Sequence, residues 1–600
     1  MINRLKRAEI EQSQTWDLDS LFSNDDNWQH AYDEFSKQLP KLDAYEGHVT
    51  ESAKALLEVL TYQEELQQQI VPIQSYAHLK SAADGTDPKN QELSGKTSRV
   101  HSRMLRAFAF IEYEIAQLSK DEIEQYFNEE PVLREYERFI TMCQTNKNHL
   151  LSKETEHVLA SLSETLQAPY TIYKQSKAAD LNFSSFTDDK GNEYPLSQAL
   201  FEDKYELSSD PSIRRNAFVR FSEGLRNYNH TFASTFATEV NRQVQESQLR
   251  GYSSVLDMLL DDQEVDQDTY HRQINTIYDQ LSPHMQRFAK LKKRILGLDE
   301  MTFADLKAPL DPNYNPEMSF DDAMDVIKEA LQVMGSDYVD MIEKAHEERW
   351  VDQADNIGKQ TGAFCMSPYG YHPYILLTWT NMMRGTFILA HELGHAGHFY
   401  HAYQNQRIGT SRPSKYMIEA PSTMNELLLA DHLLKQADSN EMKRFVILSL
   451  LGTYYHNFVT HLLEAHFQRE VYLLAEENVI LTTSKLNELK RETLKGFWGD
   501  AVTLNDGAEL TWMRQPHYYM GLYPYTYSAG LTTSTYASQR ILEEGQPAVD
   551  RWLDMINAGG SKPPLELLQM AGVDMSSSAP ISEAVAHVGS LISELERSFD

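Results

Sequence analysis

The spacing of apolar residues is the feature that most limits what this chain can fold into. From Trp16 to about Asp180, apolar side chains recur every three or four positions among Glu, Gln and Lys, which is the repeat of an amphipathic helix. The repeat returns between about residue 195 and Gly297, and again over most of the chain after Thr386. A mainly α-helical fold is therefore predicted.

Three segments interrupt the helical pattern. Asn182–Pro195 holds the turn-rich group Asp188–Asn192 between two short apolar runs and predicts a hairpin. Thr361–Trp379 is rich in aromatic and β-branched residues and is broken by Ser-Pro and Gly, which predicts two short strands. Ala308–Met318 contains three prolines and predicts a loop.

The length of 600 residues exceeds what one core normally needs, so at least two packed lobes are expected. The pattern predicts an N-terminal helical lobe over residues 1–185. It predicts a second region over residues 186–600, with an internal boundary near residues 308–318. A chain of this size has enough material to enclose a deep internal site.

Charge and composition exclude several kinds of partner. A net charge of -33 disfavours binding to nucleic-acid phosphates, which depends on Lys and Arg. The acidity is explained either by solubility or by an acidic channel that attracts basic peptides. No apolar run approaches the roughly 20 residues of a membrane span, since the longest candidate is Phe445–Gly452. We expect neither nucleic-acid nor membrane partners.

Two further features predict a cytoplasmic location. The N-terminal segment turns charged and polar where a signal peptide would need an apolar stretch. Only two cysteines, Cys143 and Cys365, occur in the chain, which argues against a disulfide framework and fits a reducing compartment.

The sequence His391-Glu392-Leu-Gly-His395 contains an HExxH motif in an apolar, helix-compatible context. A spacing of four places both histidines on one helix face, where both imidazoles can bind one metal ion. Glu392 then projects beside them toward a metal-bound water. This arrangement is typical of hydrolytic zinc sites, although the motif alone is only moderately specific.

Four residues are candidates for a third ligand, namely His398, His401, Glu419 and Glu426. His401 has the offset of the third metzincin histidine, but that pattern needs a Gly at position 398 to turn the chain out of the helix. His398 and His401 are therefore expected to continue the helix as buried or ligand-supporting residues.

Glu419 begins a helical stretch in which Ser422, Thr423 and Glu426 share its face. A helix packed beside the HExxH helix would bring Glu419 to the metal, and two imidazoles plus a carboxylate would leave one position open for water. Alternatively, Glu419 is an ordinary acidic residue at a helix N-terminus. Local sequence leaves both interpretations open, and Glu426 could be a partner of a ligating histidine or a solvated acid.

The motif and its surroundings resemble the thimet-oligopeptidase and oligoendopeptidase F group of zinc peptidases. HELGHAGH is followed by EAPSTMNE, which begins 24 residues after His395. The resemblance covers most of the chain, in order: TWDLDSLF (residues 15–22), the predicted hairpin before Tyr194, TGAFC (361–365), HPYILLTW (372–379) and HYYMGLYPYTYSAG (517–530).

The resemblance implies a two-lobed, mainly α-helical, zincin-like peptidase with a deep substrate channel and a small β element beside the metal helix. It implies one zinc ion per chain, held by His391, His395 and Glu419, with Glu392 as the general base. It also implies substrate pairing along a strand and a channel lined by a histidine and tyrosines near the C-terminus. The matching positions are Gly362, Ala363 and Phe364 for the strand, His517 for the histidine, and Tyr523, Tyr525 and Tyr527, of which we favour Tyr525 for the oxyanion.

Two departures from the family pattern stand out. Where the family has an acidic residue followed by Val ahead of the metal helix, this chain has Arg384-Gly385-Thr386. A partner of a ligating histidine is therefore expected to be absent or to come from elsewhere. Pro421 resembles the thimet branch more than oligoendopeptidase F.

The predicted function is a zinc-dependent endopeptidase that hydrolyses internal bonds of short unstructured oligopeptides, with Glu392 as general base for a zinc-activated water. The alternatives are a carboxydipeptidase-type exopeptidase with the same three ligands, a non-catalytic peptide-binding protein, and a structural helical scaffold. Two local alternatives also stand: the tyrosines could form a packed aromatic segment, and Cys365 could be a small buried residue or a redox or zinc-inhibitory switch.

Overall fold

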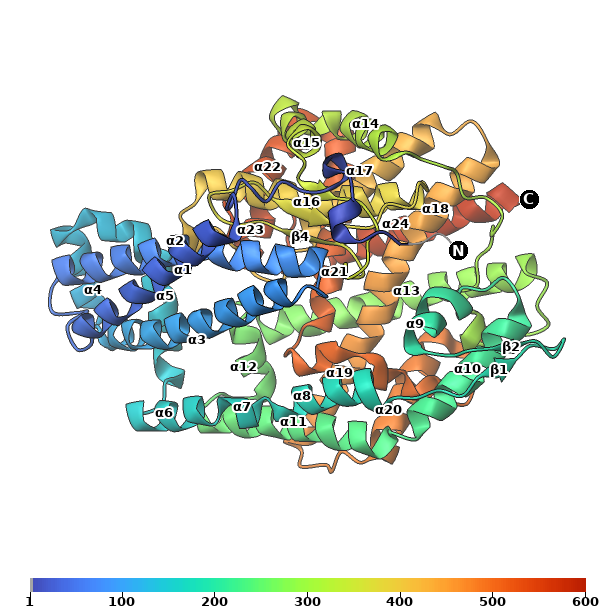
Figure 1. Ribbon diagram of the computed structural model, residues 1–600. Helices are drawn as coiled ribbons and strands as arrows, with labels where there is room; N and C mark the ends of the chain where they lie inside the picture. Colours follow the sequence, from blue (N-terminus) through green and yellow to red (C-terminus); the bar gives the residue numbers. More distant parts are fainter. Residues whose placement is uncertain (1–3, 600) are drawn as a thin grey trace.

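Helices dominate the computed structural model, which describes residues 4–599 (Figure 1). The predicted mainly α-helical class is confirmed. Polar caps begin several helices, as when the side chains of Asn24 and Ser52 accept hydrogen bonds from the backbone N–H groups of Asn27 and Ala55. The N-terminal helices are α1 (Asp25–Gln38), α2 (Ala53–Ala83), α3 (Pro88–Gln117), α4 (Lys120–Glu129) and α5 (Glu137–Thr145).

The predicted hairpin is confirmed as β1 (Phe186–Thr187) and β2 (Glu193–Tyr194), an antiparallel pair in which Phe186 lies opposite Tyr194. The helices before it are α6 (Lys153–Ser161), α7 (Ser163–Leu166) and α8 (Ala168–Gln175). Those after it are α9 (Gln198–Leu200), α10 (Pro211–Arg226), α11 (Asn229–Leu249), α12 (Val255–Asp261) and α13 (Gln267–Ile295).

A small three-stranded sheet follows α14 (Phe320–Ala330) and α15 (Ser336–Glu347), and its strand order is β3-β5-β4. The two predicted strands are confirmed as β4 (Phe364–Met366) and β5 (Tyr374–Leu376), which pair antiparallel with Cys365 opposite Ile375. β3 (Val351–Asp352) pairs parallel with β5 and was not predicted, because two residues are too short to show an alternating pattern. β4 is an edge strand.

The remaining helices form the C-terminal part of the chain. They are α16 (Arg384–Asn405), α17 (Ala420–Gln436), α18 (Asn440–Tyr454), α19 (His461–Glu476), α20 (Thr483–Trp498), α21 (Pro524–Glu544), α22 (Gln546–Asn557), α23 (Pro564–Met570) and α24 (Ala579–Phe599). A π-helical segment, η11 (Tyr455–Thr460), joins α18 directly to α19. α17 packs between α16 and α21.

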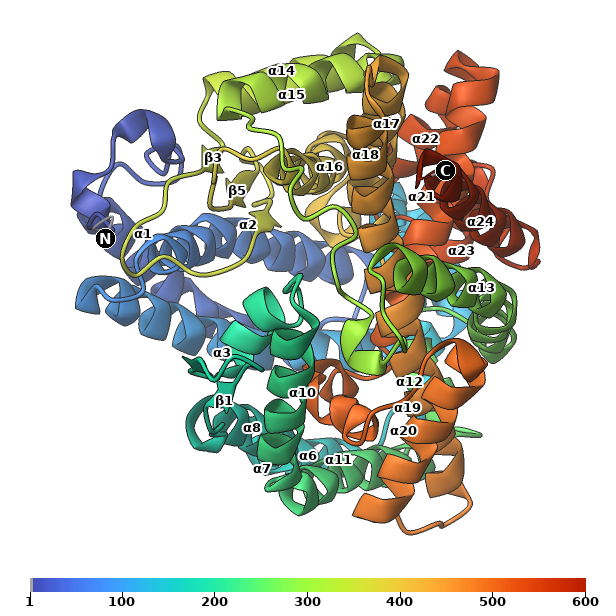
Figure 2. The same cartoon turned by 90° about the vertical axis from the view of Figure 1, so that its right-hand side faces the viewer.

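Two hydrophobic cores hold the chain together. One is formed by residues between Trp16 and Cys143, joined by Tyr374 and Leu376 of β5, and the other extends from Tyr173 to Leu595. Figure 1 shows α1–α5 gathered at one end and α6–α8 along the edge opposite α14 and α15, and Figure 2 gives the view turned by 90°. Since Tyr173 belongs to the second core, the division at residues 185 and 186 stays a prediction.

Ion pairs join the N-terminal helices to the rest of the chain. Arg407, which follows α16, pairs with Glu64 on α2 and with Glu135. Arg138 on α5 pairs with Glu264, which follows α12. These ion pairs connect helices of the first core to segments beside helices of the second core.

The two cysteines carry free thiols. Within residues 4–599, no helix combines the length and the apolar character that crossing a membrane requires.

Candidate metal centre

His391 and His395 lie on one face of α16. Leu389, Ala390 and Leu393 between and beside them are buried and hold the helix against the core. Residues four positions apart return to the same side of a helix, and the two imidazole rings lie 5.0 Å apart between centroids, nearly perpendicular to each other.

Glu419 occupies the N-cap position of α17 and reaches both histidines. Its Oε2 atom lies 3.4 Å from Nε2 of His391 and 3.4 Å from Nε2 of His395. Ser422 donates a hydrogen bond of 3.1 Å to the same oxygen. Within the described residues, these three side chains form the only group of three or more His, Cys, Asp or Glu placed to hold one metal ion.

Two glycines allow the helices around Glu419 to approach closely. A Cβ atom at Gly394 of α16 would lie 2.4 Å from the carbonyl oxygen of Pro421 on α17. A Cβ atom at Gly530 of α21 would lie 2.8 Å from Cβ of Glu419. Because such contacts are too short for packed atoms, the absence of a side chain at both positions sets how near α17 comes to its neighbours.

The donor set fits a zinc ion. Zinc bonds of about 2.0–2.1 Å at tetrahedral angles place neighbouring ligand atoms roughly 3.3–3.4 Å apart, and both nitrogen-to-oxygen distances here are 3.4 Å. Two imidazoles and one carboxylate leave a fourth position for water or substrate, which is the composition of catalytic rather than structural zinc sites.

Burial and charge act against each other in this cluster. Burial alone would lower the pKa of His391, but the carboxylates of Glu419 and Glu426 outweigh it and raise that pKa well above its usual value. Burial alone would raise the pKa of Glu419, but the imidazoles of His395 and His391 lower it well below its usual value. The two imidazoles therefore favour the ionised form of the Glu419 carboxylate.

Glu426 orients one of the two histidines. Its Oε1 atom accepts a hydrogen bond of 2.7 Å from Nδ1 of His391, and its Oε2 atom accepts one of 2.6 Å from the hydroxyl of Thr453 on α18. This contact directs Nε2 of His391 toward Oε2 of Glu419. Arg384 is exposed and has no partner within the described residues, and Nδ1 of His395 also has none there.

Glu392 is buried beside the cluster, with 6% of its surface exposed. Burial raises its pKa above the usual value for a glutamate, against the opposing effect of His391 and His395. A carboxylate with a raised pKa in a water-poor site is suited to accepting and returning a proton near neutral pH.

Two of the three predicted tyrosines lie beside the cluster together with His517. Tyr523 is the N-cap of α21, and its spacing places it on the same face as Tyr527 and Gly530, where a Cβ atom added at Gly530 would lie 2.8 Å from Cβ of Glu419. The Tyr527 hydroxyl lies 3.5 Å from Nε2 of His517, whose Nδ1 donates to Oε1 of Gln515 at 3.3 Å. The rings of Tyr523 and Tyr527 lie 5.3 Å apart.

Tyr525 does not lie beside the metal-binding group, which corrects the expectation that it contacts the oxyanion. Its side chain is 1% exposed, and its hydroxyl donates a hydrogen bond of 2.9 Å to Oε1 of Gln263. Its ring packs against Tyr270 and Tyr416. The physical reason is helical: residues 523–527 begin a helix, so Tyr525 points about 160–200° away from Tyr523 and Tyr527, whereas alternation along an extended segment would have aligned all three.

Sequence reasoning missed three polar residues around η11. Thr453 bonds to Glu426, and the His456 and His461 side chains meet at 3.2 Å between their Nε2 atoms. His461 in turn stacks on Tyr527. They belong to no motif with a recognisable spacing, and the π-helical segment that pairs the histidines leaves no signal in apolar periodicity.

The predicted substrate strand is only partly a strand. Phe364 begins β4, whereas Gly362 and Ala363 precede it, and Gly362 has a φ of 90°. β4 packs against α16 and has a free edge. Cys365 on this strand is half-buried, burial raises the pKa of its thiol, and its Sγ lies 3.5 Å from the hydroxyl of Ser367.

His398 and His401 continue α16, as expected, and neither belongs to the metal-binding group. His398 is fully buried, and burial lowers its pKa to about 3. Its two ring nitrogens make no hydrogen bond within the described residues. The His401 ring stacks on Tyr338 at 5.7 Å between centroids.

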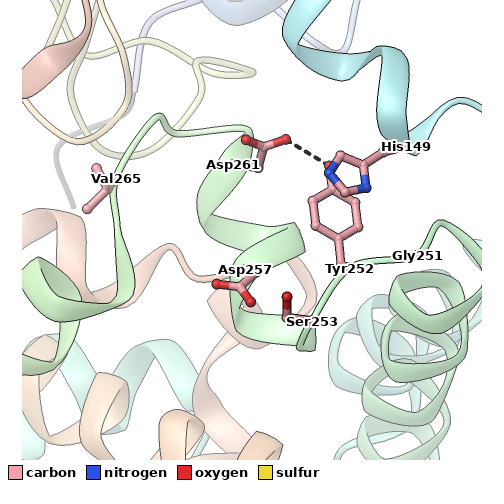
Figure 3. Close-up of a pocket in the computed structure, with 7 residues that line it drawn as sticks. All are labelled: His149, Gly251, Tyr252, Ser253, Asp257, Asp261 and Val265. Atoms are coloured by element: carbon pink, nitrogen blue, oxygen red, sulfur yellow. Dashed lines mark hydrogen bonds between the residues drawn. The ribbon is translucent and has the colours of Figure 1, made fainter.

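A separate open hollow of about 310 Å³ lies at the junction of the segment before α6 with the loop before α12 (Figure 3). The His149 ring stacks on Tyr252 at 3.5 Å between centroids, and the Tyr252 hydroxyl donates to Asp261. None of the residues that line it belongs to the metal-binding group. The hollow therefore lies between two segments of the chain, and its lining residues form no metal-binding group like that of His391, His395 and Glu419.

Comparison with known proteins gives matches over most of the chain. The sequence profile described as "Peptidase family M3" matches residues 204–587, and the profile described as "Oligopeptidase F" matches residues 114–183. Oligopeptidase PepF of Bacillus subtilis is 30% identical over 98% of this chain and 88% of that protein. Group B oligopeptidase PepB of Streptococcus agalactiae is 29% identical over 98% of each chain.

Solved structures share the fold over the whole chain. The crystal structure of a peptidase from Chlamydophila abortus has a TM-score of 0.90 and 27% identity, and the match covers 99% of this chain and 100% of that one. The crystal structure of oligoendopeptidase-F from Enterococcus faecium has a TM-score of 0.75 and 26% identity, and the match covers 96% and 99% of the two chains.

Proposed function

This chain belongs to peptidase family M3, and from that premise we propose that it is a zinc-dependent endopeptidase that cleaves short unstructured oligopeptides, with Glu392 as its general base. The resemblance to the oligoendopeptidase F group is confirmed, and the chain is a metallopeptidase acting on oligopeptides. One observation supports the zinc mechanism most directly. Oε2 of Glu419 lies 3.4 Å from Nε2 of His391 and 3.4 Å from Nε2 of His395.

In the proposed mechanism, Glu392 carries out the proton transfers. When bound, zinc lowers the pKa of a coordinated water and polarises a carbonyl group. Glu392 takes a proton from the attacking water and delivers it to the leaving amine. Its burial keeps bulk water away from that proton, and its raised pKa reduces the cost of holding it between the two steps.

We propose that Tyr527 donates a hydrogen bond to the scissile carbonyl oxygen as negative charge develops on it, and its contacts with Tyr523 and His517 support this role. β4 has a free edge beside α16 and can pair with the substrate backbone by strand addition. Such pairing would select for extended peptides rather than folded proteins.

The two tyrosine substitutions Tyr527→Phe and Tyr525→Phe should separate chemistry from stability. Tyr527→Phe should lower kcat by roughly 10–10³, because a donor to the developing charge is lost. Tyr525→Phe should leave kcat within about twofold and cost about 1 kcal/mol of stability, because it loses only the buried bond to Gln263. Steady-state kinetics and thermal unfolding measure both effects, and the opposite pattern would return the oxyanion role to Tyr525.

Digestion of a mixed peptide pool with and without a chelator tests the proposed function. We expect internal cleavage of short peptides whose two ends are chemically blocked, complete loss of activity with the chelator, and recovery on adding zinc. Mass spectrometry identifies each product. Cleavage confined to peptides with a free C-terminus would favour the carboxydipeptidase alternative, and chelator-resistant cleavage would contradict a metal-dependent mechanism.

A further inference from the structure

The π-helical segment η11 brings two histidines together beside the metal centre. In a π-helix the repeat is one residue longer than in an α-helix, so residues five positions apart lie side by side. His456 lies within η11 and His461 follows it. Their Nε2 atoms are 3.2 Å apart, and their rings are nearly perpendicular at 4.5 Å between centroids.

His461 has a fixed position. Its side chain is 3% exposed, and its ring lies flat against Tyr527 at 3.9 Å between centroids. Its Nδ1 atom is buried and makes no hydrogen bond within the described residues. The ring therefore has one hydrogen-bonding contact, which is the contact with His456.

His456 faces the cluster of ligands. Thr453, one helical turn earlier, bonds to the Glu426 carboxylate that holds His391, and the Tyr527 ring lies 5.9 Å from that of His456. The His456 side chain is exposed, yet burial lowers its pKa, with a further contribution from Lys307. His456 therefore lies near the residues that hold the cluster and is open to solvent.

The hydrogen bond between His456 and His461 fixes the tautomer of each ring. If His456 donated from Nε2, neutral His461 would carry its proton on Nδ1, leaving a buried N–H without an acceptor, which is rare in proteins. If His461 donates instead, only an acceptor nitrogen is left unpaired, and the single proton of His456 sits on its Nδ1 atom. That Nδ1 has no partner within the described residues. The second arrangement leaves an N–H donor on His456 free to bind a ligand.

We propose that Nδ1–H of His456 donates a hydrogen bond to a main-chain carbonyl oxygen of the bound peptide, and that His461 is the positioning residue that holds this tautomer. A neutral donor recognises an acceptor without requiring charge, and the peptide backbone offers one at every residue. The contact is therefore independent of substrate side chains. The inference rests on the proposed peptidase function and adds a substrate contact to it.

Substitution of His456 by Asn, Gln and Ala tests the contact, because the Asn amide nitrogen lies near the position of Nδ1 and that of Gln near the position of Nε2. His456→Gln and His456→Ala should lower kcat/KM by about 5- to 30-fold, mostly through KM. His456→Asn should stay within about threefold of the wild type. The zinc content of all three should equal that of the wild type, and His30→Gln on α1 provides a control at an exposed histidine.

His461→Phe tests the positioning role, because phenylalanine can keep the stack on Tyr527 while it removes the donor to His456. It should lower kcat/KM about two- to fivefold in the wild-type background but leave activity unchanged in the His456→Ala background. A purely structural role would lower activity equally in both backgrounds.

Three results would overturn the inference while leaving the peptidase function intact: equal activity of all His456 variants and the wild type, retention by Gln with loss in Asn, or equal losses in all three variants. A loss of zinc in the His456 variants would also overturn it, because the residue would then act on the metal centre. Absence of cleavage by the wild-type protein would instead refute the proposed function and, with it, this contact.

Discussion

Glu392→Gln is expected to lower kcat by roughly 10²–10⁴ while zinc content and stability stay close to those of the wild type. Glutamine fills the same space in a site where Glu392 is 6% exposed, so the packing is kept. It cannot accept a proton from water, so both proton transfers assigned to this residue are lost. Steady-state kinetics on a blocked peptide, with zinc measured by elemental analysis, provides the test.

Glu419→Gln is the matched comparison, because it makes the same chemical change at the neighbouring carboxylate. It should reduce zinc affinity, since the neutral amide replaces a carboxylate ligand placed 3.4 Å from both imidazoles. Added zinc should then restore part of the activity of Glu419→Gln but none of that of Glu392→Gln. Wild-type turnover by Glu392→Gln would contradict its role as general base.

Gly394→Ala is expected to abolish tight zinc binding although it touches no ligand. The added Cβ would lie 2.4 Å from the Pro421 carbonyl oxygen and 2.6 Å from Cα of Ser422, both of which are backbone atoms that cannot rotate away. α16 and α17 must therefore separate, which moves Glu419 from the two histidines. We expect a stability loss of about 1–3 kcal/mol and a fall in zinc affinity of at least roughly 100-fold.

Gly95→Ala on α3 is the control for that substitution, because it makes the same change within a helix. A Cβ atom there meets nothing within 4 Å, so the substitution should be neutral or stabilise the protein by up to about 1 kcal/mol. Zinc titration and thermal unfolding of both variants complete the comparison. Normal zinc affinity in Gly394→Ala would show that the approach of α17 to α16 does not control the position of Glu419.

Local sequence was sufficient to predict features that depend on residues within about one helical turn of each other. The HExxH spacing places His391 and His395 on one face of α16, and the missing glycine at position 398 correctly predicts that His398 and His401 continue the helix. Strand-like composition also located β4 and β5 between residues 361 and 379. These features depend on side chains within a few positions of each other, so their pattern is visible without tertiary contacts.

Contacts between distant segments could not be predicted in the same way. The partner of His391 is Glu426, 35 positions later, and the sequence left open whether Glu426 meets a histidine or solvent. The tyrosines show the same limit, because the direction in which Tyr525 points depends on whether the segment is extended or begins a helix, and it begins a helix.

The sequence by itself determined the helical class and the shared face of His391 and His395, because both follow from a repeat of three or four residues. Only the tertiary structure decided that Glu419 lies between α16 and α21, that Tyr525 faces the core, and that His456 meets His461. The physical reason is that helix packing depends on close approach at positions such as Gly394 and Gly530, where atoms from three helices must fit together.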